Sequence, residues 1–169
     1  MKGDAEKFAC RVDGWLLKKE GELLYDLAKK CSGRGAIVEV GSWKGKSTIW
    51  LAFGSKDGAK ARVYAIDPHT GSQEHRDLYG KLDTFGEFSK NISCAGVSEI
   101  VKPLVKTSEE AARSFSEPVE LVFIDGAHEY DMVEKDFQLW FPRLVEGGVM
   151  AFHDTIGWEG QIRVARDRI

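Results

Sequence analysis

Polar and glycine residues that could bind a ligand or move a proton occur at five places in the chain, each near the end of a short apolar run. In chain order they are Gly41 to Gly45, Asp67, Lys106 to Ser108, Asp125 to His128, and His153 with Asp154. Carboxylates and imidazoles can take up protons, and glycine turns let a ligand approach the backbone. The available chemistry therefore depends on whether the fold brings these places together.

The stretch from Ile37 to Thr48, IVEVGSWKGKST, ends in G-K-S-T like a phosphate-binding loop. Such a loop needs four residues between its glycines, whereas Gly41 and Gly45 are separated by three. The dinucleotide pattern G-x-G-x-x-G also fails, since Trp43 stands at its second glycine. A P-loop kinase or NTPase stays open as an alternative, because LVFID (121–125) resembles the strand and aspartate that hold magnesium in such enzymes. It predicts magnesium-dependent ATP binding that requires Lys46.

Two carboxylates favour a different ligand. Glu39, two residues before Gly41, would repel a phosphate at close range and suits a ligand with an ammonium group. Asp67 ends the second apolar run, where an acid commonly accepts hydrogen bonds from a ribose diol. A nucleoside with a cationic substituent and no diphosphate meets both requirements. S-adenosylmethionine is such a molecule, and its carboxylate could lie at a helix N-terminus near Lys46 and Ser47.

The elements that must position these residues alternate along the chain. Apolar runs predict strands at 36–41, 61–67, 99–105, 118–125 and 147–154, and periodic segments predict helices at 14–32, 46–54, 85–95, from Thr107, and at 129–144. This alternation predicts one α/β domain over residues 1–169, with an open, doubly wound, mostly parallel sheet. Ligands bind such sheets at the carboxyl ends of the strands, where the five polar places fall. We expect Trp140 and Phe141 in the core, and a functional loop at 68–82.

Composition and charge argue against several classes of protein. The 169 residues are 43% hydrophobic with a net charge of −3, which is ordinary for a soluble globular protein and unlike a nucleic-acid binder. The three cysteines, Cys10, Cys31 and Cys94, lie far apart, which disfavours a disulfide framework or a zinc site. No apolar run has the length of a signal peptide core or a membrane span. We therefore expect a cytoplasmic protein that binds neither nucleic acid nor membrane.

Taken together, the motifs resemble those of a known enzyme family. The likeness is carried by VEVGSWKGKST, VYAIDPHTGS, TSEEAA and LVFIDGAHEYDMVEKDFQLWFPRLVEGGVMAFHD. These segments resemble the successive motifs of class I S-adenosylmethionine-dependent methyltransferases, in particular a small family with D-G-x-H after the fourth strand and H-D after the fifth. The likeness runs from about Trp15 to Asp154. It implies a Rossmann-like methyltransferase fold with strand order 3-2-1-4-5 and a cofactor-binding core over 36–154.

The resemblance also implies which residues bind S-adenosylmethionine. They are Glu39, Gly41, Ser42, Trp43, Gly45, Ser47, Asp67, Pro68, Ser108 and Asp125. Among them, Trp43 would pack over the methionine part, Ser47 would reach its carboxylate, and Ser108 would lie by the adenine edge. Lys44 and Lys46 are instead expected to be solvated charges.

Methyl transfer to a hydroxyl also requires a group that removes the acceptor proton, and histidine is the usual choice. We predict His128 as this general base, with Asp125 beside it as a second catalytic residue. His69 and His75, in the segment 68–82, are expected to contact the acceptor.

A metal is a further possibility. Related O-methyltransferases hold a divalent metal with an acid after strand four and a polar pair after strand five, which correspond here to Asp125, His153 and Asp154. Because His153 stands where an acid is usual, magnesium, a transition metal and no metal all stay open.

The chain departs from the family after Asp154, where only TIGWEGQIRVARDRI follows in place of a helix and a β-hairpin. We expect the C-terminal hairpin to be missing, and a partner subunit of a homo-oligomer could then complete the acceptor pocket. The predicted activity is methyl transfer from S-adenosylmethionine to a small-molecule acceptor, with a hydroxyl as the expected target (an O-methyltransferase). The main alternative is a non-catalytic binding module with a degenerate methyltransferase fold.

Overall fold

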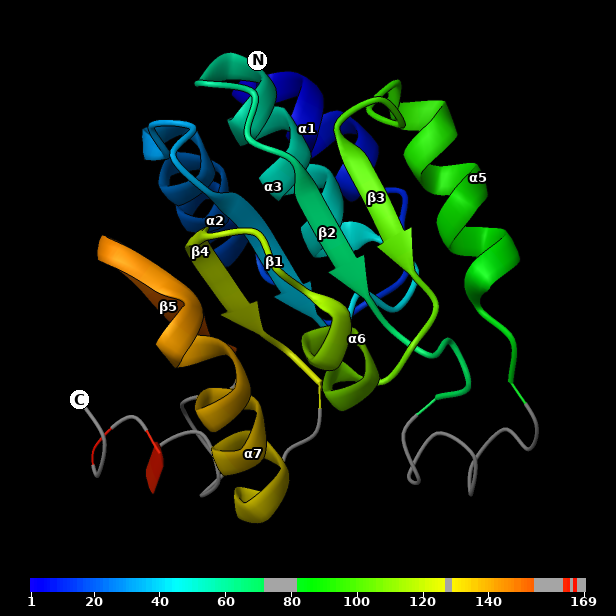
Figure 1. Cartoon of the computed structure of the whole chain (residues 1–169). Coiled ribbons are helices and arrows are strands. Elements are labelled where there is room, and N and C mark those ends of the chain that lie inside the picture. Colours follow the sequence, from blue (N-terminus) through cyan, green and yellow to red (C-terminus); the bar gives the residue numbers. More distant parts are fainter. Residues whose placement is uncertain (72–81, 127–128, 154–162, 165, 167–169) are drawn as a thin grey trace.

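The computed structural model of the chain describes residues 1–71, 82–126, 129–153, 163–164 and 166. Within these residues, five parallel strands form one sheet in the order β3-β2-β1-β4-β5 (Figure 1). The strands are β1 (Ala36–Val40), β2 (Val63–Ile66), β3 (Val101–Leu104), β4 (Val119–Ile124) and β5 (Leu144–Phe152). The predicted α/β class and the strand order 3-2-1-4-5 are confirmed.

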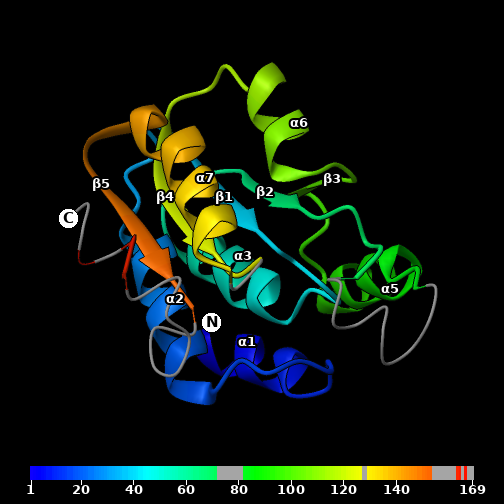
Figure 2. The same cartoon turned by 90° about the horizontal axis from the view of Figure 1, so that it is seen from below.

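Helices cover both faces of the sheet and produce three layers (Figure 2). On one face lie α2 (Lys18–Lys30), α3 (Lys46–Asp57) and α5 (Phe85–Ala95), with α1 (Lys2–Ala9) outside α3. On the other face lie α6 (Ser108–Ser114) and α7 (Tyr130–Trp140), and a 3-10 turn, η1 (Phe141–Arg143), leads into β5. The doubly wound arrangement predicted from the alternation is therefore confirmed.

The core explains why the central elements are so apolar. Strands β1 and β4 are buried along their whole length, because helices cover both of their faces. Helix α3 is buried from Ser47 to Ser55, since α1 and α2 cover the side that faces away from the sheet. One apolar cluster joins these helices and α5 to the sheet, and a second joins α6 and Trp140 to the opposite face.

At the N-terminus the structure contains a helix that the sequence pattern does not predict. Helix α1, KGDAEKFA, has few apolar residues, but Ala5 and Ala9 are buried in the first cluster. The predicted helix over 14–32 begins only at Lys18, where the Glu20 carboxylate accepts a hydrogen bond from the Leu17 N–H at 2.7 Å. Residues 10–17 thus connect α1 to α2, and this connection lies beside the turn that follows β1.

The predicted helix over 129–144 also has different limits. It ends at Trp140, and Pro142 in the following 3-10 turn has no N–H with which to continue an α-helix. Strand β5 then begins at Leu144 rather than at 147. Phe141, expected in the core, is 47% exposed, whereas Trp140 is fully buried, so the expectation holds for one residue of the pair.

A buried carboxylate fixes the connection from α2 to β1. Glu120 in β4 accepts hydrogen bonds from the backbone N–H groups of Ser32, Gly33 and Gly35 and from the Ser32 hydroxyl. Burial by itself would raise the pKa of Glu120, but these donors hold it below its ordinary value. The chain therefore enters β1, the strand that leads to Gly41, from a fixed point.

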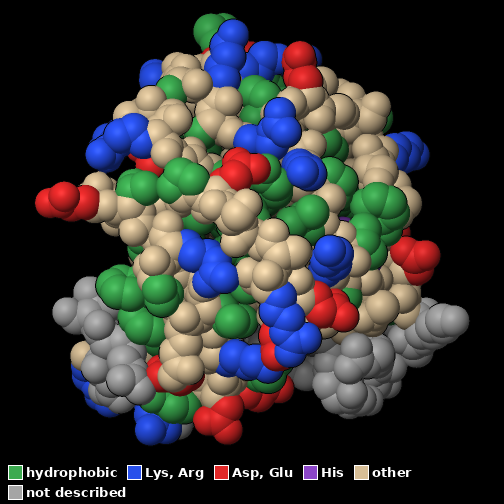
Figure 3. Space-filling view, in the orientation of Figure 1, with side chains coloured by type: hydrophobic (Ala, Val, Ile, Leu, Met, Phe, Trp, Pro, Cys, Tyr) green, Lys and Arg blue, Asp and Glu red, His purple; other side chains and the backbone are tan. Residues whose placement is uncertain are grey.

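The face of the molecule seen in Figure 3 carries Lys and Arg side chains interspersed with Asp and Glu. No helix in the described part of the chain is both long and apolar enough to cross a membrane. The expected absence of a C-terminal hairpin concerns residues that lie mostly outside the described part.

Candidate active site

The ends of four neighbouring strands form one edge at which predicted site residues meet. The backbone ladder continues one residue past each strand: the N–H groups of Gly41, Asp67, Asp125 and His153 donate to the carbonyls of Ile66, Leu104, Val40 and Ile124 at 2.9, 3.2, 2.8 and 3.0 Å. These four residues are therefore fixed at one level of the sheet. The prediction that the strand ends converge is confirmed for them.

The turn after β1 depends on glycine. Gly41 has a φ of 89°, and a Cβ there would lie 2.3 Å from the carbonyl oxygen of Asp125, so only glycine fits. Trp43 and Gly45 also adopt positive φ, 46° and 92°, and Gly45 is the N-cap of α3. This turn brings the backbone of the β1–α3 connection against the end of β4.

Glu39 lies under this turn and is fully buried. One of its carboxylate oxygens, Oε2, accepts a hydrogen bond from the Thr48 hydroxyl, and burial raises the pKa of Glu39 to about 8 although the Ser47 and Thr48 hydroxyls lower it. Its other oxygen, Oε1, and the Ser42 hydroxyl have no hydrogen-bond partner among the described residues. Two buried polar atoms next to the glycine turn thus lack a hydrogen-bond partner among the described residues, which is uncommon for buried polar atoms.

Ser47 and Thr48 both lie by the Glu39 carboxylate, and their hydroxyls lower its pKa. Contact between the Ser47 hydroxyl and the ligand carboxylate stays a prediction. The motif analysis did not single out Thr48. Its position in the first turn of the helix that follows Glu39 and Gly41 could have marked it as a partner of the glutamate.

Asp67 joins the two loops that flank it. Its Oδ2 accepts a hydrogen bond from the Trp43 N–H at 2.7 Å, and its Oδ1 accepts one from the His69 N–H at 2.6 Å. Pro68 beside it is exposed. Because each carboxylate oxygen can accept more than one hydrogen bond, Asp67 can hold the loops and still receive hydroxyl donors.

Ser108 has partners on α7. Its hydroxyl accepts a hydrogen bond from the Trp140 indole N–H at 2.9 Å and also bonds to the carboxyl group of Asp136. Burial raises the pKa of Asp136 to about 6, although the Ser108 bond lowers it. The hydroxyl thus connects α6 to α7, and a contact with an adenine edge stays a prediction.

The end of β5 contains a carboxylate–imidazole–carboxylate cluster. His153 is 7% exposed; its Nδ1 lies 3.0 Å from Asp125 Oδ1 and its Nε2 lies 3.1 Å from Glu20 Oε2. Asp125 is more accessible, with 22% of its side chain exposed. Glu20 lies in the first turn of α2, and no local pattern in the sequence marks it as a site residue, since 133 positions separate it from His153.

The predicted metal site gains no support from this geometry. Asp125 and His153 do meet, but Asp154 lies outside the described residues. Within the described part of the chain, no group of three acid, histidine or cysteine side chains is arranged to hold a metal ion. His128, the predicted base, and His75 also lie outside the described residues.

The two lysines of the turn are not solvated charges as predicted. Lys46 Nζ donates to the Gly14 carbonyl at 2.7 Å, and Lys44 Nζ pairs with Glu87 at 2.9 Å and with Asp13 at 3.3 Å. Both side chains are partly buried, because the connection between α1 and α2 passes beside them. The lysine that a phosphate-binding loop would use is thus held by the backbone of that connection.

The same connection carries exposed apolar side chains. Trp15 is 68% exposed, and its ring centroid lies 6.3 Å from that of Trp43. Leu17 is 67% exposed and precedes α2, three residues before Glu20. Large apolar side chains therefore lie in solvent on a segment that contacts the glycine turn and leads directly into the first turn of α2, where Glu20 contacts His153.

His69 does not have the position expected of an acceptor-binding residue. Its side chain is 2% exposed and packs against the rings of Phe85 and Phe88, with centroids at 5.3 and 5.2 Å. Its Nδ1 lies 2.9 Å from the Thr84 hydroxyl. The histidine is thus part of the packing under the strand ends rather than of an open surface.

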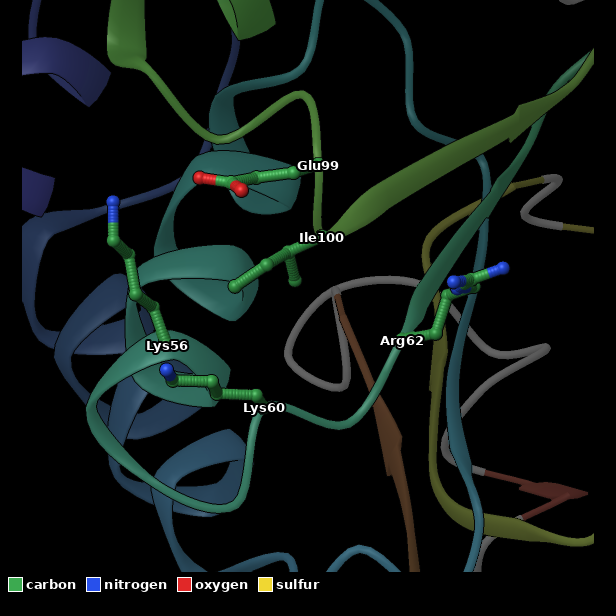
Figure 4. Close-up of a pocket in the computed structure, with 5 residues that line it drawn as sticks. All are labelled: Lys56, Lys60, Arg62, Glu99 and Ile100. Atoms are coloured by element: carbon green, nitrogen blue, oxygen red, sulfur yellow. The ribbon is translucent and has the colours of Figure 1, made fainter.

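A pocket of about 230 Å³ lies elsewhere, at the amino ends of β2 and β3 (Figure 4). It is lined by Lys56, Lys60, Arg62, Glu99 and Ile100, none of which is a predicted site residue. Because it opens at the edge opposite the glycine turn, it is separate from the candidate active site.

Comparison with known proteins finds a family model that matches most of the chain. A family model described as a methyltransferase domain matches residues 38–155. A curated relative, the uncharacterised protein y4gI of Sinorhizobium fredii, is 31% identical over 121 residues, which are 70% of this chain and 13% of that protein. A second, protein R132 of Acanthamoeba polyphaga mimivirus, is 25% identical over 137 residues, which are 78% of this chain and 58% of the relative. The chain thus spans less than two thirds of either relative.

Solved structures share the fold. An O-methyltransferase from Bacillus cereus in complex with S-adenosylhomocysteine is 21% identical, with a TM-score of 0.67 over 99% of this chain and 71% of that chain. The O-methyltransferase TomG from Streptomyces achromogenes, in complex with S-adenosylmethionine, is 21% identical, with a TM-score of 0.64 over 98% of this chain and 74% of that chain. At these identities the likeness establishes the arrangement of helices and strands.

Proposed function

Because this chain belongs to the methyltransferase domain family, we propose that it transfers the methyl group of S-adenosylmethionine to a hydroxyl of a small-molecule acceptor. The observation that carries the proposal is the edge where the glycine turn, the buried Glu39 and Asp67 lie on neighbouring strands. Structures of the same fold with S-adenosylmethionine and S-adenosylhomocysteine support it.

The residues at this edge fit the cofactor. Gly41 lets the turn lie against the backbone of Asp125, because a Cβ at this position would be 2.3 Å from the Asp125 carbonyl oxygen. The unpaired Glu39 Oε1 and Ser42 hydroxyl offer buried polar atoms beside that turn. The N-terminus of α3 favours a carboxylate, and Asp67 on the next strand can accept hydrogen bonds from ribose hydroxyls. We propose that these groups, with Trp43, Gly45, Pro68 and Ser108, bind the cofactor as the resemblance implies.

When bound, S-adenosylmethionine would supply a methyl group for transfer to the acceptor oxygen, with the thioether of S-adenosylhomocysteine as the leaving group. The residues of the protein must align the acceptor with the methyl group and remove the acceptor's proton. We propose Asp125 for this role, because 22% of its side chain is exposed and its Oδ1 lies 3.0 Å from His153 Nδ1. His128 stays a second proposed base.

We propose that the acceptor lies against the connection between α1 and α2. Trp15 and Leu17 expose large apolar surfaces there, and the same segment reaches His153 through Glu20. Exposed aromatic side chains on an anchored backbone suit an acceptor with a flat, apolar part next to its hydroxyl.

Titration calorimetry with S-adenosylmethionine, S-adenosylhomocysteine and Mg-ATP tests the cofactor. Binding of the first two and not of Mg-ATP is expected, and the absence of binding by both adenosyl ligands would overturn the proposal. A labelled methyl donor with a panel of aromatic and aliphatic hydroxyl compounds, with Mg²⁺ and with EDTA, then tests transfer and metal dependence. Cofactor binding without transfer to any acceptor would favour the alternative of a non-catalytic module.

A further inference from the structure

We propose that His69 is a positioning residue that fixes the Asp67 carboxylate for the cofactor ribose and couples it to helix α5. The inference rests on the proposed function, in which Asp67 accepts hydrogen bonds from the ribose hydroxyls. His69 reaches no open surface, so its role differs from the acceptor contact expected from the sequence.

The backbone of His69 supplies the first link. Its φ is 58°, a left-handed conformation that residues other than glycine adopt only rarely. In this conformation its N–H donates to Asp67 Oδ1 at 2.6 Å. The orientation of the carboxylate therefore depends on a backbone geometry that some other contact must maintain.

The side chain of His69 supplies that contact. Its Nδ1 lies 2.9 Å from the Thr84 hydroxyl, while the Thr84 N–H donates to the His69 carbonyl at 3.1 Å. Two hydrogen bonds thus join His69, two residues after Asp67, to the N-cap of α5, and the imidazole packs against the rings of Phe85 and Phe88. A residue with two polar bonds and two ring contacts has little freedom to leave its conformation.

The same cluster also supports the glycine turn. A Cβ on Gly45 would lie 3.2 Å from Phe88, so the ring under His69 also underlies the N-cap of α3. The second oxygen of Asp67 is held from this side, by the Trp43 N–H. Both carboxylate oxygens are therefore fixed by backbone groups whose positions depend on one buried aromatic cluster.

The surroundings of the His69 side chain favour the neutral imidazole. Burial lowers the pKa of His69, although the carboxylates of Asp67 and Asp83 and the Trp43 carbonyl raise it. With Thr84, Phe85 and Phe88, these are the groups that face the ring from the packed elements.

The test compares the affinities of S-adenosylhomocysteine and its 2′-deoxyribosyl analogue, measured by calorimetry at pH 7.5. In the wild type a correctly held Asp67 should favour the complete ribose by about tenfold or more, since removing a hydroxyl leaves a polar partner unpaired. His69→Phe keeps the ring but removes the Thr84 bond, and Thr84→Val removes its hydroxyl partner. Both should weaken S-adenosylhomocysteine binding and reduce the preference to roughly threefold or less.

Two further variants separate positioning from folding. His69→Asn, which tolerates positive φ and retains a side-chain amide toward Thr84, should recover part of the preference. Phe115→Leu, which loosens packing on the opposite face against Tyr64 and Trp140, should lower stability and leave the preference unchanged.

The outcomes are distinct. Asp67→Ala serves as the reference for complete loss of the ribose preference. If the preference is unchanged in both His69→Phe and Thr84→Val, the inference is overturned while the proposed function stands. A wild-type protein that binds neither ligand would overturn the proposed function and the inference together. If His69→Phe does not fold, Thr84→Val decides the question, because it leaves His69 in place.

Discussion

At the scale of single residues, the site is defined by carboxylates in very different surroundings. Glu39 is fully buried with one unpaired oxygen, Asp67 is held by two backbone N–H groups, and Asp125 is partly exposed against His153. The same functional group can therefore organise a turn, receive hydroxyl donors, or accept a proton, because burial and hydrogen bonding decide which protonation state is favoured.

The burial of Glu39 leads to a prediction about pH. Its pKa in the folded protein, about 8, lies above its ordinary value, so folding favours the protonated form and its contribution to stability is lost as pH rises from about 4.5 to 8. Glu39→Gln, which stays neutral, should gain roughly 2–4 kcal/mol relative to the wild type between pH 5 and pH 8. Urea unfolding at both pH values measures this difference.

The control for this experiment is Glu129→Gln, an exposed glutamate at the N-cap of α7. Its effect on unfolding should be the same at pH 5 and pH 8. A Glu39→Gln effect that does not change with pH would show that Glu39 is ionised in the folded protein across this range.

Asp67 carries the prediction on cofactor affinity. Asp67→Ala should weaken binding of S-adenosylhomocysteine by about 1–3 kcal/mol, because the N–H groups of Trp43 and His69 and the bound hydroxyls lose their acceptor. Calorimetry measures the change, with Asp26→Ala, a carboxylate on α2 that pairs with Lys2, as the control. Equal affinity in wild type and Asp67→Ala would remove Asp67 from the site.

At the scale of elements, the packing of α2 on α3 sets the position of the turn and of Glu20. A Cβ on Gly54 would lie 2.3 Å from the Tyr25 carbonyl, and one on Gly21 would lie 2.3 Å from the Trp50 indole. These two glycines allow the helices to approach closely. The first turn of α2 is thereby brought to His153, and the N-terminus of α3 to Asp125 and Asp67.

This packing predicts the effect of small substitutions. Gly54→Ala should destabilise the protein by about 1–3 kcal/mol, because the new methyl group meets backbone that cannot move independently. Gly86→Ala in α5, where nothing lies within 4 Å of the new Cβ, should be neutral or stabilise by up to about 1 kcal/mol. Chemical denaturation of both variants measures the difference, and similar values for the two would contradict this account of the α2–α3 contact.

The connection between α1 and α2 carries a prediction on the acceptor. Trp15→Ala should raise the KM for an apolar acceptor by roughly tenfold and leave the affinity for S-adenosylhomocysteine within about twofold, since Trp15 would contact the acceptor alone. Trp15→Phe should retain most of the acceptor affinity. A loss of cofactor affinity in Trp15→Ala would place Trp15 on the cofactor side, through its contact with Trp43.

At the scale of the whole molecule, the strand order places the site residues next to one another. Because β1 lies between β2 and β4, Asp67 and Asp125 flank the turn of Gly41 from both sides, although 58 positions separate them in the sequence. A ligand bound at the Gly41 turn would therefore lie next to the ends of both β2 and β4.

Binding at such an edge should therefore stabilise the folded chain as a unit. S-adenosylhomocysteine at about 100 times its Kd should raise the free energy of unfolding by about 2.7 kcal/mol, and Tm by roughly 5–10 °C. Thermal unfolding measures this shift, which should be smaller in Asp67→Ala at the same ligand concentration. A larger shift with Mg-ATP than with S-adenosylhomocysteine would support the P-loop alternative instead.

The sequence by itself determined the fold class, the strand order through the resemblance, and the edge where Gly41, Asp67, Asp125 and His153 meet. These features follow from local signals: short apolar runs, the glycines that end them, and the alternation of strands with helices. The helix predicted from Thr107 is confirmed for the same reason, since the Thr107 hydroxyl and the Glu110 carboxylate bond to each other's backbone N–H groups within its first turn.

Only the tertiary structure decided what individual side chains do at that edge. It pairs Glu20 with His153, holds Lys46 on Gly14, and buries His69 against two rings of α5, and none of these contacts has a local signature. The physical reason is that a charged or polar side chain has the same sequence pattern whether it is solvated or paired. Its partner is fixed by the packing of distant segments, which here brings the start of α2 to the end of β5.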